Sequence, residues 1–511
     1  MNNEIKRLIG ETLMLAFDGT EYNEELDSLI HEYYIRNFIL FGKNVESCEQ
    51  VARLNGRLIQ EADSPLFIAV DQEGGIVRRV RSGVFPLPGA MAMAAGDPDS
   101  IRDACYLTGK GLKALGFNCD FAPDADVNSN PKNPVICARS YGDNPQKVAE
   151  YATEAALGFQ ESGMLPTLKH FPGHGDTAVD SHVGLPSIGK TKEEMAACEL
   201  VPFKYGADHG VDGIMCGHLQ VNCYDDTYPS SLSRAILTDL LRKELGYKGL
   251  LVTDSLTMSA IWGHYTTKEI VKLSLLAGND IILFCGDSCP KQHREIINAA
   301  YELYEEGVIT KELLEDRANR VKAMKAKYPC VTPDLSMLFN EAEQQEGRYL
   351  QEQSITLVRD DAHLIPVKDT KKMLIISEPT GTATIGEGEK IKYTTVGSVS
   401  GLDEVIIEPG VGLIEELKKH ILAIESNYDT IVLANYRAKD SSGLIEIYKE
   451  LDKNKVALLL LRSPFEATFY PGVKTVIAAY DGTIESLKAV AHVLSYRLPL
   501  NGKLPVDSKN I

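Results

Sequence analysis

The sequence predicts an α/β protein in which a (β/α)8 barrel of the TIM type is followed by a smaller α/β sandwich domain. Over the first 330 residues, eight short apolar runs alternate with amphipathic segments of helical period. This pattern is typical of repeated β-α units around a parallel sheet. A polar stretch follows, and four more buried-strand patterns come after it. The length of 511 residues accommodates one barrel and one domain of medium size.

The expected barrel strands are short apolar runs. They lie at residues 13–17, 38–41, 66–70, 118–121, 165–168, 213–216, 250–253 and 280–284. Helices are expected between them, including 101–115, 145–161, 233–245 and 267–276. The last two begin with Ser and Thr, which cap helix N-termini because their side chains accept a hydrogen bond from a free backbone N–H.

The chain divides into three expected regions. Residues 1–331 form the barrel domain, residues 332–353 a polar linker, and residues 354–511 the α/β sandwich domain. In the last region, strands are expected at 372–376, 430–434, 457–461 and 475–479, with helices at 412–424, 442–451 and 484–494. This alternation predicts a layered domain with a largely parallel sheet.

The composition excludes several classes of protein. Lys and Arg number 53 and Asp and Glu 72, so the net charge of −19 argues against binding to nucleic acid or to an anionic membrane. No run approaches the ~20 apolar residues that span a bilayer, and the N-terminal residues lack the pattern of a secretion signal. Ten irregularly spaced cysteines, all before residue 331, predict buried free thiols. We therefore expect a cytoplasmic location.

Polar and ionisable residues gather after five of the expected strands. The functional groups of a barrel collect where the carboxyl ends of its strands meet the following loops, so these residues are candidates for a site. Each also has a structural alternative, since an Asp after a strand often caps a helix or forms a turn, and a lone His is often buried and satisfied by backbone groups. The residues are Asp71, Arg79, Asp124, Asp126, Arg139, the segment 169–182, His218 and Asp254.

Within the segment 169–182, His170 and His174 have the i, i+4 spacing of a helical zinc motif. Pro172 and Gly173 lie between them and prevent the helix that would bring both rings to one face. No metal site is therefore predicted. The sequence also lacks a Gly-x-Ser-x-Gly elbow and a phosphate-binding Gly-x-x-x-x-Gly-Lys-Ser/Thr loop, so no cofactor is expected.

Asp180 and His182 stand two residues apart near the tip of the same segment. In an extended or turn backbone, this spacing lets the carboxylate accept a hydrogen bond from one imidazole nitrogen while the other nitrogen faces a substrate. The pair is expected to act as an acid/base dyad.

Five sequence strings carry a family resemblance. They are Asp-Gln-Glu-Gly-Gly at 71–75, Asn-Pro-x-Asn-Pro-Val-Ile at 130–136, Arg-Ser-Tyr-Gly at 139–142, Lys-His-Phe-Pro-Gly-His-Gly-Asp-Thr-x-x-Asp-Ser-His at 169–182 and Thr-Asp-Ser-Leu-x-Met at 253–258. Together they resemble glycoside hydrolase family 3, and in particular its NagZ-like β-N-acetylglucosaminidase branch. The match runs from about residue 5 to 330, and the tail resembles the second domain of the family.

The resemblance implies a role for each candidate residue. Asp254 would be the nucleophile that forms a covalent glycosyl-enzyme with retention of configuration. His182 would be the acid/base, and Asp180 would orient it. The residues that would hold the sugar hydroxyls are Asp71, Arg79, Arg139, Lys169 and His170.

Three positions depart from the pattern of the family. Ile76 stands where the family commonly has arginine, Asp124 where the residue is usually apolar, and Cys137 where glycine is usual. We expect these departures to affect the preference for sugar and aglycone rather than the nucleophile or the dyad.

The resemblance implies a β-N-acetylhexosaminidase that removes a non-reducing terminal GlcNAc from small glycosides such as peptidoglycan fragments, in a role in peptidoglycan recycling. A phosphorylase is an alternative, because a histidine base, neutral after giving up its proton, does not repel a phosphate acceptor as a carboxylate would. A non-catalytic sugar-binding protein is a second alternative. A β-glucosidase or β-xylosidase is disfavoured, since those branches lack the Asp180-Ser181-His182 loop. The only expected partner is the carbohydrate substrate, and the oligomeric state is left open.

Overall fold

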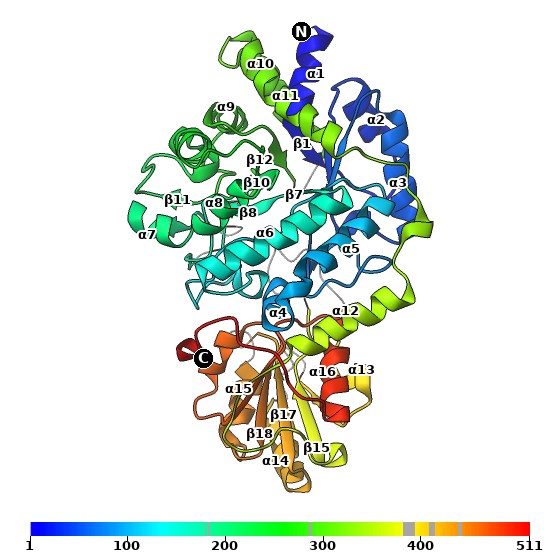
Figure 1. Ribbon diagram of the computed structural model, residues 1–511, viewed down its shortest axis with the longest axis vertical. Coiled ribbons are helices and arrows are strands. Elements are labelled where there is room, and N and C mark those ends of the chain that lie inside the picture. The colour runs from blue at the N-terminus through cyan, green and yellow to red at the C-terminus, as the bar shows by residue number, and fades with distance from the viewer. Residues whose placement is uncertain are drawn as a thin grey trace.

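The computed structural model of the protein describes residues 2–178, 180–181, 184–285, 289–381, 394–407, 414–437 and 442–511. A barrel domain carries the N-terminus, and a smaller domain lies beneath it with helix α12 (Glu341–Ser354) between them (Figure 1). The C-terminus returns to the junction of the two domains (Figure 1). No helix among the described residues is long and apolar enough to cross a membrane.

Within the described residues, eight strand positions form a closed parallel ring. One sheet has the order β13-β1-β2-β3-β6-β7 and a second the order β12-β10-β8. β7 and β8 are successive parts of one strand position, and a parallel bridge from Val252 to Ile281 joins β12 to the residue before β13. The strands are β1 (Leu13–Ala16), β2 (Asn37–Leu40), β3 (Phe67–Val70), β6 (Cys119–Asp120), β7 (Leu165–Pro166), β8 (Leu168–Phe171), β10 (Gly213–Cys216), β12 (Leu250–Thr253) and β13 (Ile282–Phe284).

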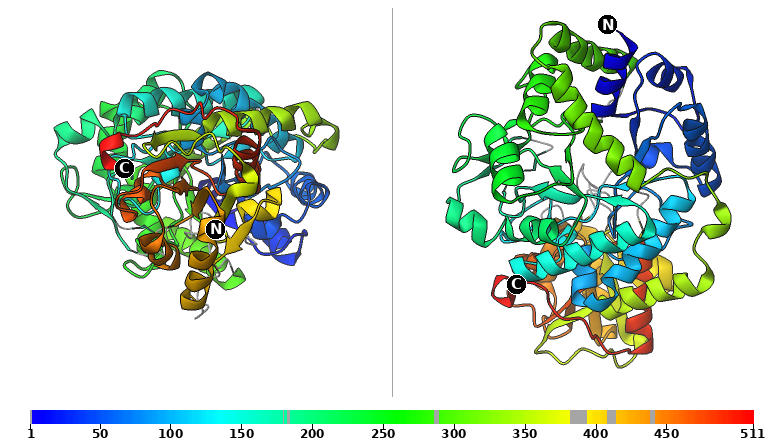
Figure 2. Two further views of the ribbon diagram at one scale, coloured as in Figure 1. Left: turned by 90° about the horizontal axis from the view of Figure 1, so that it is seen from below. Right: turned by 45° about the horizontal axis from the view of Figure 1, so that its top comes forward.

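Alternate strand residues fill the barrel interior because neighbouring side chains of a strand point to opposite faces. Phe67, Phe121 and Met215 belong to this inner cluster, and Val321 and Tyr328 from the region of α11 join it. The opposite faces pack against surrounding helices (Figure 2). The helices are α1 (Asn3–Thr12), α2 (Glu24–His31), α3 (Cys48–Glu61), α5 (Ile101–Ala114), α6 (Pro145–Ser162), α7 (Lys192–Ala197), α8 (Val201–Asp208), the π-helix η5 (Ala235–Glu244), α9 (Thr267–Ala277), α10 (Pro290–Glu305) and α11 (Lys311–Lys327).

The second domain is built on a six-stranded sheet with the order β14-β19-β18-β17-β15-β16. β14 pairs antiparallel with β19, and the other pairs are parallel. Apolar clusters cover both faces, one including residues of α16 and the other residues of α14 and α15. The elements are β14 (Thr356–Asp360), β15 (Met373–Ser377), α13 (Val396–Ser400), β16 (Glu404–Ile406), α14 (Ile414–Ile424), β17 (Thr430–Asn435), α15 (Ser442–Glu450), β18 (Val456–Leu460), β19 (Thr475–Ala478) and α16 (Ile484–Tyr496).

The two domains share an apolar interface. Met91 and Ala92 of the short helix α4 (Ala90–Ala95) and Cys137 of the turn η3 (Cys137–Arg139) cluster with Phe465 and Tyr480 of the second domain. α12 packs against both α4 and α16, and the backbone N–H of Lys503 donates to the carbonyl of Ala95 at 2.7 Å.

The predicted fold class is confirmed, including all eight barrel strands and the four strands predicted in the tail. In the second domain the edge strands β14 and β16 were missed, because β14 has only one fully buried residue and β16 has none. The short strands β4 (Gln72–Gly74), β5 (Val77–Arg78), β9 (Ser187–Ile188) and β11 (Gln220–Val221) of the barrel domain were also not predicted. α12 occupies much of the range 332–353 expected to be a linker, where its mostly exposed polar residues gave little apolar signal. All ten cysteines are free, but only five are buried, four are partly exposed, and Cys289, the N-cap residue of α10, is exposed, so the expectation of buried thiols holds for half of them.

Candidate active site

A cavity of about 570 Å³ opens at the carboxyl end of the barrel strands. Six of the candidate residues lie in its wall, although they come from four different strand ends: Asp71, Arg79, Arg139, Lys169, His170 and Asp254. Apolar surface is supplied by Phe41, Met215 and Trp262, among others. All the described residues that line the cavity belong to the barrel domain. The gathering of polar groups predicted from the strand ends is therefore present in three dimensions.

Two carboxylates and three cations form a continuous network on one side of the cavity. Nζ of Lys169 lies 3.0 Å from Oδ1 of Asp71 and 2.6 Å from Oε1 of Glu73, so it bridges the two acids. Arg139 donates to both oxygens of Glu73, at 2.9 and 2.8 Å. Nη2 of Arg79 lies 3.3 Å from Oδ2 of Asp71. Because every member is paired, the network is a rigid wall.

The network also sets the protonation of its members. Burial by itself raises the pKa of Asp71, but Lys169 and Arg79 outweigh it and hold that pKa below its ordinary value. The same balance, with Arg139 and Lys169, lowers the pKa of Glu73. Burial lowers the pKa of Lys169, but the two acids outweigh it and the net pKa is raised. Asp71 is therefore an ionised acceptor at the cavity surface at neutral pH.

Behind this wall, Asp126 holds the segment that follows the fifth strand. Its Oδ1 accepts from the backbone N–H groups of His170 and His174, at 3.2 and 2.6 Å. Its Oδ2 lies 2.7 Å from Nδ1 of His170, whose Nε2 lies 3.4 Å from Nη2 of Arg139. Arginine is only a donor, so the tautomer with the proton on Nδ1 satisfies both contacts.

Asp124 lies beside Asp126 but ionises differently. Burial and the neighbouring charge of Asp126 raise the pKa of Asp124 well above its ordinary value, and its Oδ2 has no hydrogen-bond partner. Ligand atoms of Asp124, Asp126 and His170 lie within 4.8 Å of one another, the arrangement of a possible cation site. Both oxygens of Asp126 are already hydrogen-bonded to the histidines, so only Asp124 retains a free acceptor there.

Described residues of the segment 169–182, which carries the predicted dyad, are anchored at the cavity. Nε2 of His174 lies 3.1 Å from Oγ of Ser181, and its Nδ1 lies 2.7 Å from Oγ1 of Thr177. Burial lowers the pKa of His174 to about 4, so the ring is neutral and bridges the two hydroxyls. Ser181 lines the cavity and Asp180 is half-buried beside it. His182 lies outside the described residues.

Asp254 follows β12 and is half-buried at the cavity. Its backbone N–H donates to the carbonyl of Cys216 at 2.7 Å, and its Oδ1 accepts from the N–H of Ser255 at 2.7 Å. The first contact ties the backbone of Asp254 to the end of the neighbouring strand β10, and the second orients its carboxylate. His218, in contrast, contacts Oγ of Ser231 and the carbonyl of Ser255, both at 2.8 Å, and is fully buried. His218 is therefore a buried structural histidine, the alternative to a site residue that the sequence allowed.

The second domain contacts the cavity loops from behind. The hairpin β4 (Gln72–Gly74) and β5 (Val77–Arg78) carries Glu73, and a side chain on Gly75 would meet the backbone of Gly89 at 2.8 Å and Asp481 Oδ2 at 3.1 Å. Nη2 of Arg78 lies 2.6 Å from Oε2 of Glu485. Cys137, in the turn that positions Arg139, has a φ of 44°, in the left-handed region that favours glycine.

Some residues of the cavity were not predicted as site residues. Glu73 was present in the quoted string 71–75, but its link to Arg139 and Lys169 depends on side-chain partners that spacing does not show. Trp262, the only tryptophan of the chain, also lines the cavity. The presence of a single tryptophan in the sequence was a usable signal, because its large ring with one polar N–H suits a binding site.

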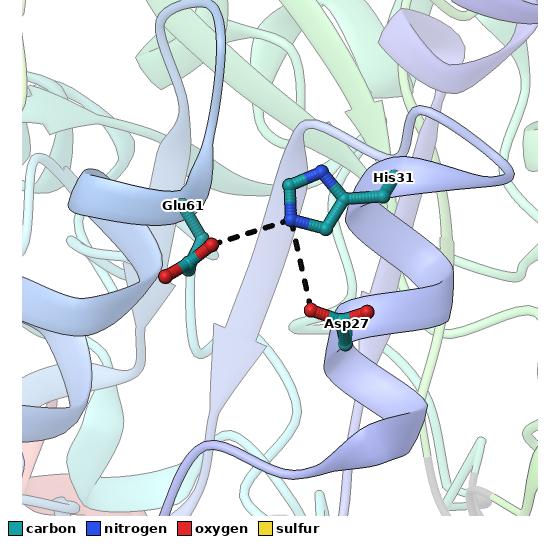
Figure 3. A group of neighbouring side chains, drawn as sticks. All are labelled: Asp27, His31 and Glu61. Atoms are coloured by element: carbon teal, nitrogen blue, oxygen red, sulfur yellow. Dashed lines mark hydrogen bonds and ion pairs between the residues drawn. The ribbon is translucent and has the colours of Figure 1, made fainter.

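A second group of possible ligands lies on the surface. Nε2 of His31 lies 3.7 Å from Asp27 and 3.3 Å from Glu61, so the three link α2 to α3 (Figure 3). His31 and Asp27 are exposed, and both contacts use the same ring nitrogen. We interpret the group as a surface ion pair.

A closed parallel barrel whose strand ends bring carboxylates and cations to one cavity is the architecture of a barrel enzyme. Comparison with known proteins makes this class specific. The family model described as "Glycosyl hydrolase family 3 N terminal domain" matches residues 4–324. The chain therefore belongs to glycosyl hydrolase family 3.

Curated relatives and solved structures agree with this assignment. Beta-hexosaminidase A of Pseudoalteromonas piscicida is 34% identical over 386 residues, which cover 70% of this chain and 64% of the relative. The beta-hexosaminidase of Tolumonas auensis is 34% identical over 54% of this chain and 83% of its own. A family 3 β-N-acetylglucosaminidase structure from Paenibacillus sp. str. FPU-7 superposes with a TM-score of 0.90, at 32% identity over 99% of both chains.

Proposed function

We propose that the protein is a retaining β-N-acetylglucosaminidase that removes a non-reducing terminal GlcNAc residue from small glycosides. The observation that carries the proposal is the cavity whose wall contains both Asp254 and an ionised, ion-paired Asp71. The names of the hexosaminidase relatives and of the Paenibacillus structure support the choice of sugar. A cavity of about 570 Å³ suits a terminal sugar with part of its aglycone.

Asp254 is the proposed nucleophile. Its Oδ1 accepts from the N–H of Ser255, which orients the carboxylate at the cavity. Attack on the anomeric carbon breaks the glycosidic bond through an oxocarbenium-like transition state and forms a glycosyl ester with Asp254. Water then attacks the anomeric carbon from the face that the aglycone has left and displaces the Asp254 carboxylate, so two inversions retain the configuration.

His182 is the proposed acid/base and Asp180 its orienting partner. In the first step His182 would protonate the leaving oxygen, and in the second it would remove a proton from the incoming water. Support comes from the neighbouring residue Ser181, which lines the cavity and is held by His174. One histidine can serve both steps because the proton that it gives to the leaving oxygen is replaced by the proton that it takes from water.

Asp71, Arg79, Arg139, Lys169 and His170 are the proposed sugar-binding residues. Asp71 is an ionised acceptor for sugar hydroxyls, while Lys169 and the arginines are donors. Each contact has to replace hydrogen bonds that the hydroxyl makes with water, which is why charged and pre-oriented partners are needed.

The charges at the cavity favour water over phosphate as the acceptor. Lys43 is paired with Asp18, and Arg79, Arg139 and Lys169 all lie against Asp71 or Glu73. A phosphate dianion would therefore meet cations that already contact carboxylates, and the carboxylate of Asp254 would repel it.

We also propose the wider setting of the enzyme. Residues 1–331 would form the catalytic domain, 332–353 the connection and 354–511 the second domain. The ten free cysteines suit a reducing cytoplasm, and peptidoglycan fragments are the proposed natural substrate.

The test is turnover of an aryl β-GlcNAc substrate with and without phosphate, followed by identification of the products. We expect free GlcNAc in both cases. The variant Asp254→Asn should lose activity by at least about 1,000-fold, while Asp99→Asn, which changes an exposed carboxylate, should keep it. Unchanged turnover by D254N would contradict the mechanism, and GlcNAc 1-phosphate as product would contradict hydrolysis.

A further inference from the structure

A second cavity, of about 420 Å³, lies at the amino end of the barrel strands, opposite the catalytic cavity. Its wall comes from η5, the turn before β12, the end of α9, and α11. Five of its described lining residues are cations and none is an acid: Arg234, Arg242, Lys248, Arg317 and Arg320. We call this cavity the basic groove. Such a concentration is unexpected in a chain with a net charge of −19.

Two of the cations form a fixed floor. Nη2 of Arg242 and Nε of Arg320 bind the two oxygens of the buried Asp280, at 2.7 and 2.6 Å. Asp280 also accepts from the backbone N–H of Leu251 at 2.9 Å. Arg242 donates to the carbonyl of Gly249 at 2.6 Å. The guanidinium groups are thus held in place before any ligand arrives, so little side-chain entropy is lost on binding.

The cations of the basic groove are more numerous than the carboxylates that contact them. Arg317 contacts Asp316 at 2.8 Å, but its Nε is buried with no hydrogen-bond partner. Burial lowers the pKa of Arg317, and the neighbouring Arg320 and Arg242 lower it further. Arg234 and Lys248 are exposed and make no hydrogen bond or ion pair with the described residues. The five cations are thus opposed by two contacting carboxylates, those of Asp280 and Asp316.

We propose that the basic groove binds a small molecule that carries phosphate groups, of the size of a sugar phosphate or a diphosphate. Planar guanidinium groups match the geometry of phosphate oxygens and bind them in pairs. The volume falls in the range of small-molecule sites, about 300–1,000 Å³. Leu276 and Leu313 offer apolar wall for the carbon part of such a ligand. The site is independent of the sugar cavity and needs none of its residues.

The experiment is calorimetric titration of the full chain with inorganic pyrophosphate at low ionic strength. The double variant Arg234→Gln/Lys248→Gln removes the two exposed, unpaired cations of the groove. The control Lys272→Gln/Lys322→Gln removes the same charge from exposed positions on α9 and α11 that do not line it. All three proteins should hydrolyse an aryl β-GlcNAc substrate equally, which shows that each is folded.

We expect pyrophosphate to bind the wild-type chain and the control, and to bind the double variant at least about tenfold more weakly, the effect of losing one charge-assisted hydrogen bond. Affinity should fall as salt is added. No binding to the wild-type chain, or equal affinity for the wild-type chain and the groove variant, would overturn the proposal.

Discussion

The buried Asp120 gives a prediction whose size can be worked out from its surroundings. It ends β6 beneath the ion-pair network, where its Oδ1 accepts from the backbone N–H of Gln72 at 2.9 Å and its Oδ2 has no partner. Burial raises its pKa from 3.8 to about 8. In the folded protein the group therefore keeps its proton at neutral pH, whereas in the unfolded chain it has lost it.

Because of this difference, Asp120 destabilises the folded protein by an amount that depends on pH. Above pH 3.8 the unfolded state binds fewer protons than the folded state, so stability falls as pH rises until the folded pKa is reached. Each pH unit is worth about 1.36 kcal/mol, so the 3.2 units up to pH 7.0 correspond to about 4 kcal/mol. Asparagine keeps the acceptor oxygen but does not titrate. Relative to wild type, the free energy of unfolding of Asp120→Asn should increase by about 3 kcal/mol between pH 4.5 and pH 7.0.

Urea unfolding at several pH values, followed by the fluorescence of Trp262, measures this gain within the barrel. The exposed Asp99→Asn variant should differ from wild type by a constant amount across the same range. The reasoning is refuted if the difference between D120N and wild type is also constant from pH 4.5 to pH 7.0. That result would mean that Asp120 is ionised in the folded protein.

Three further variants test other parts of the site. Asp126→Asn should destabilise the protein by about 3–5 kcal/mol at pH 7, since it breaks the buried pair with His170. Because the pKa of Asp126 is lowered in the folded protein, this loss should shrink as pH falls below 4. Urea unfolding at pH 7 and below pH 4 would show whether it does. Asp71→Asn should lower kcat/KM for an aryl β-GlcNAc by about 10- to 100-fold through one lost charged acceptor. It also breaks ion pairs with Lys169 and Arg79, so a urea midpoint above zero is needed to show that the assayed variant is folded; a loss below twofold would rule out sugar contact. Arg78→Gln should cost about 1 kcal/mol or less in a thermal melt, because Glu485 is 36% exposed, and a larger loss would show that the pair is shielded from solvent.

The barrel was predictable because its strands are buried on both faces and read as uninterrupted apolar runs. β12 and β10 were located to the residue for this reason. β14 and β16 lie at the edges of the second sheet and are partly exposed, so their composition does not separate them from loops. Periodicity reports burial, and where burial is incomplete the signal is lost.

The candidate site was predictable to a similar extent. The order of residues along the chain shows which side chains follow a strand, and closure of the barrel brings those ends together. The order of residues does not show which side chains form ion pairs or hydrogen bonds with one another. The bridge of Lys169 between Asp71 and Glu73, and the opposite protonation of Asp124 and Asp126, arise from side chains that meet only in the folded state. The role of the second domain was equally hidden, since Arg78 and Glu485 are 407 residues apart.

The contact of the second domain with the cavity loops has a consequence for how this enzyme can change. Asp481 and Glu485 touch the hairpin that carries Glu73, and Phe465 and Tyr480 pack on the turn that carries Arg139, yet none of them lines the cavity. Substitutions in the second domain can therefore shift two loops of the cavity wall without altering any residue that lines the cavity. Selection for a new substrate, in nature or in the laboratory, has a second set of positions to act on, remote from the chemistry and free of its constraints.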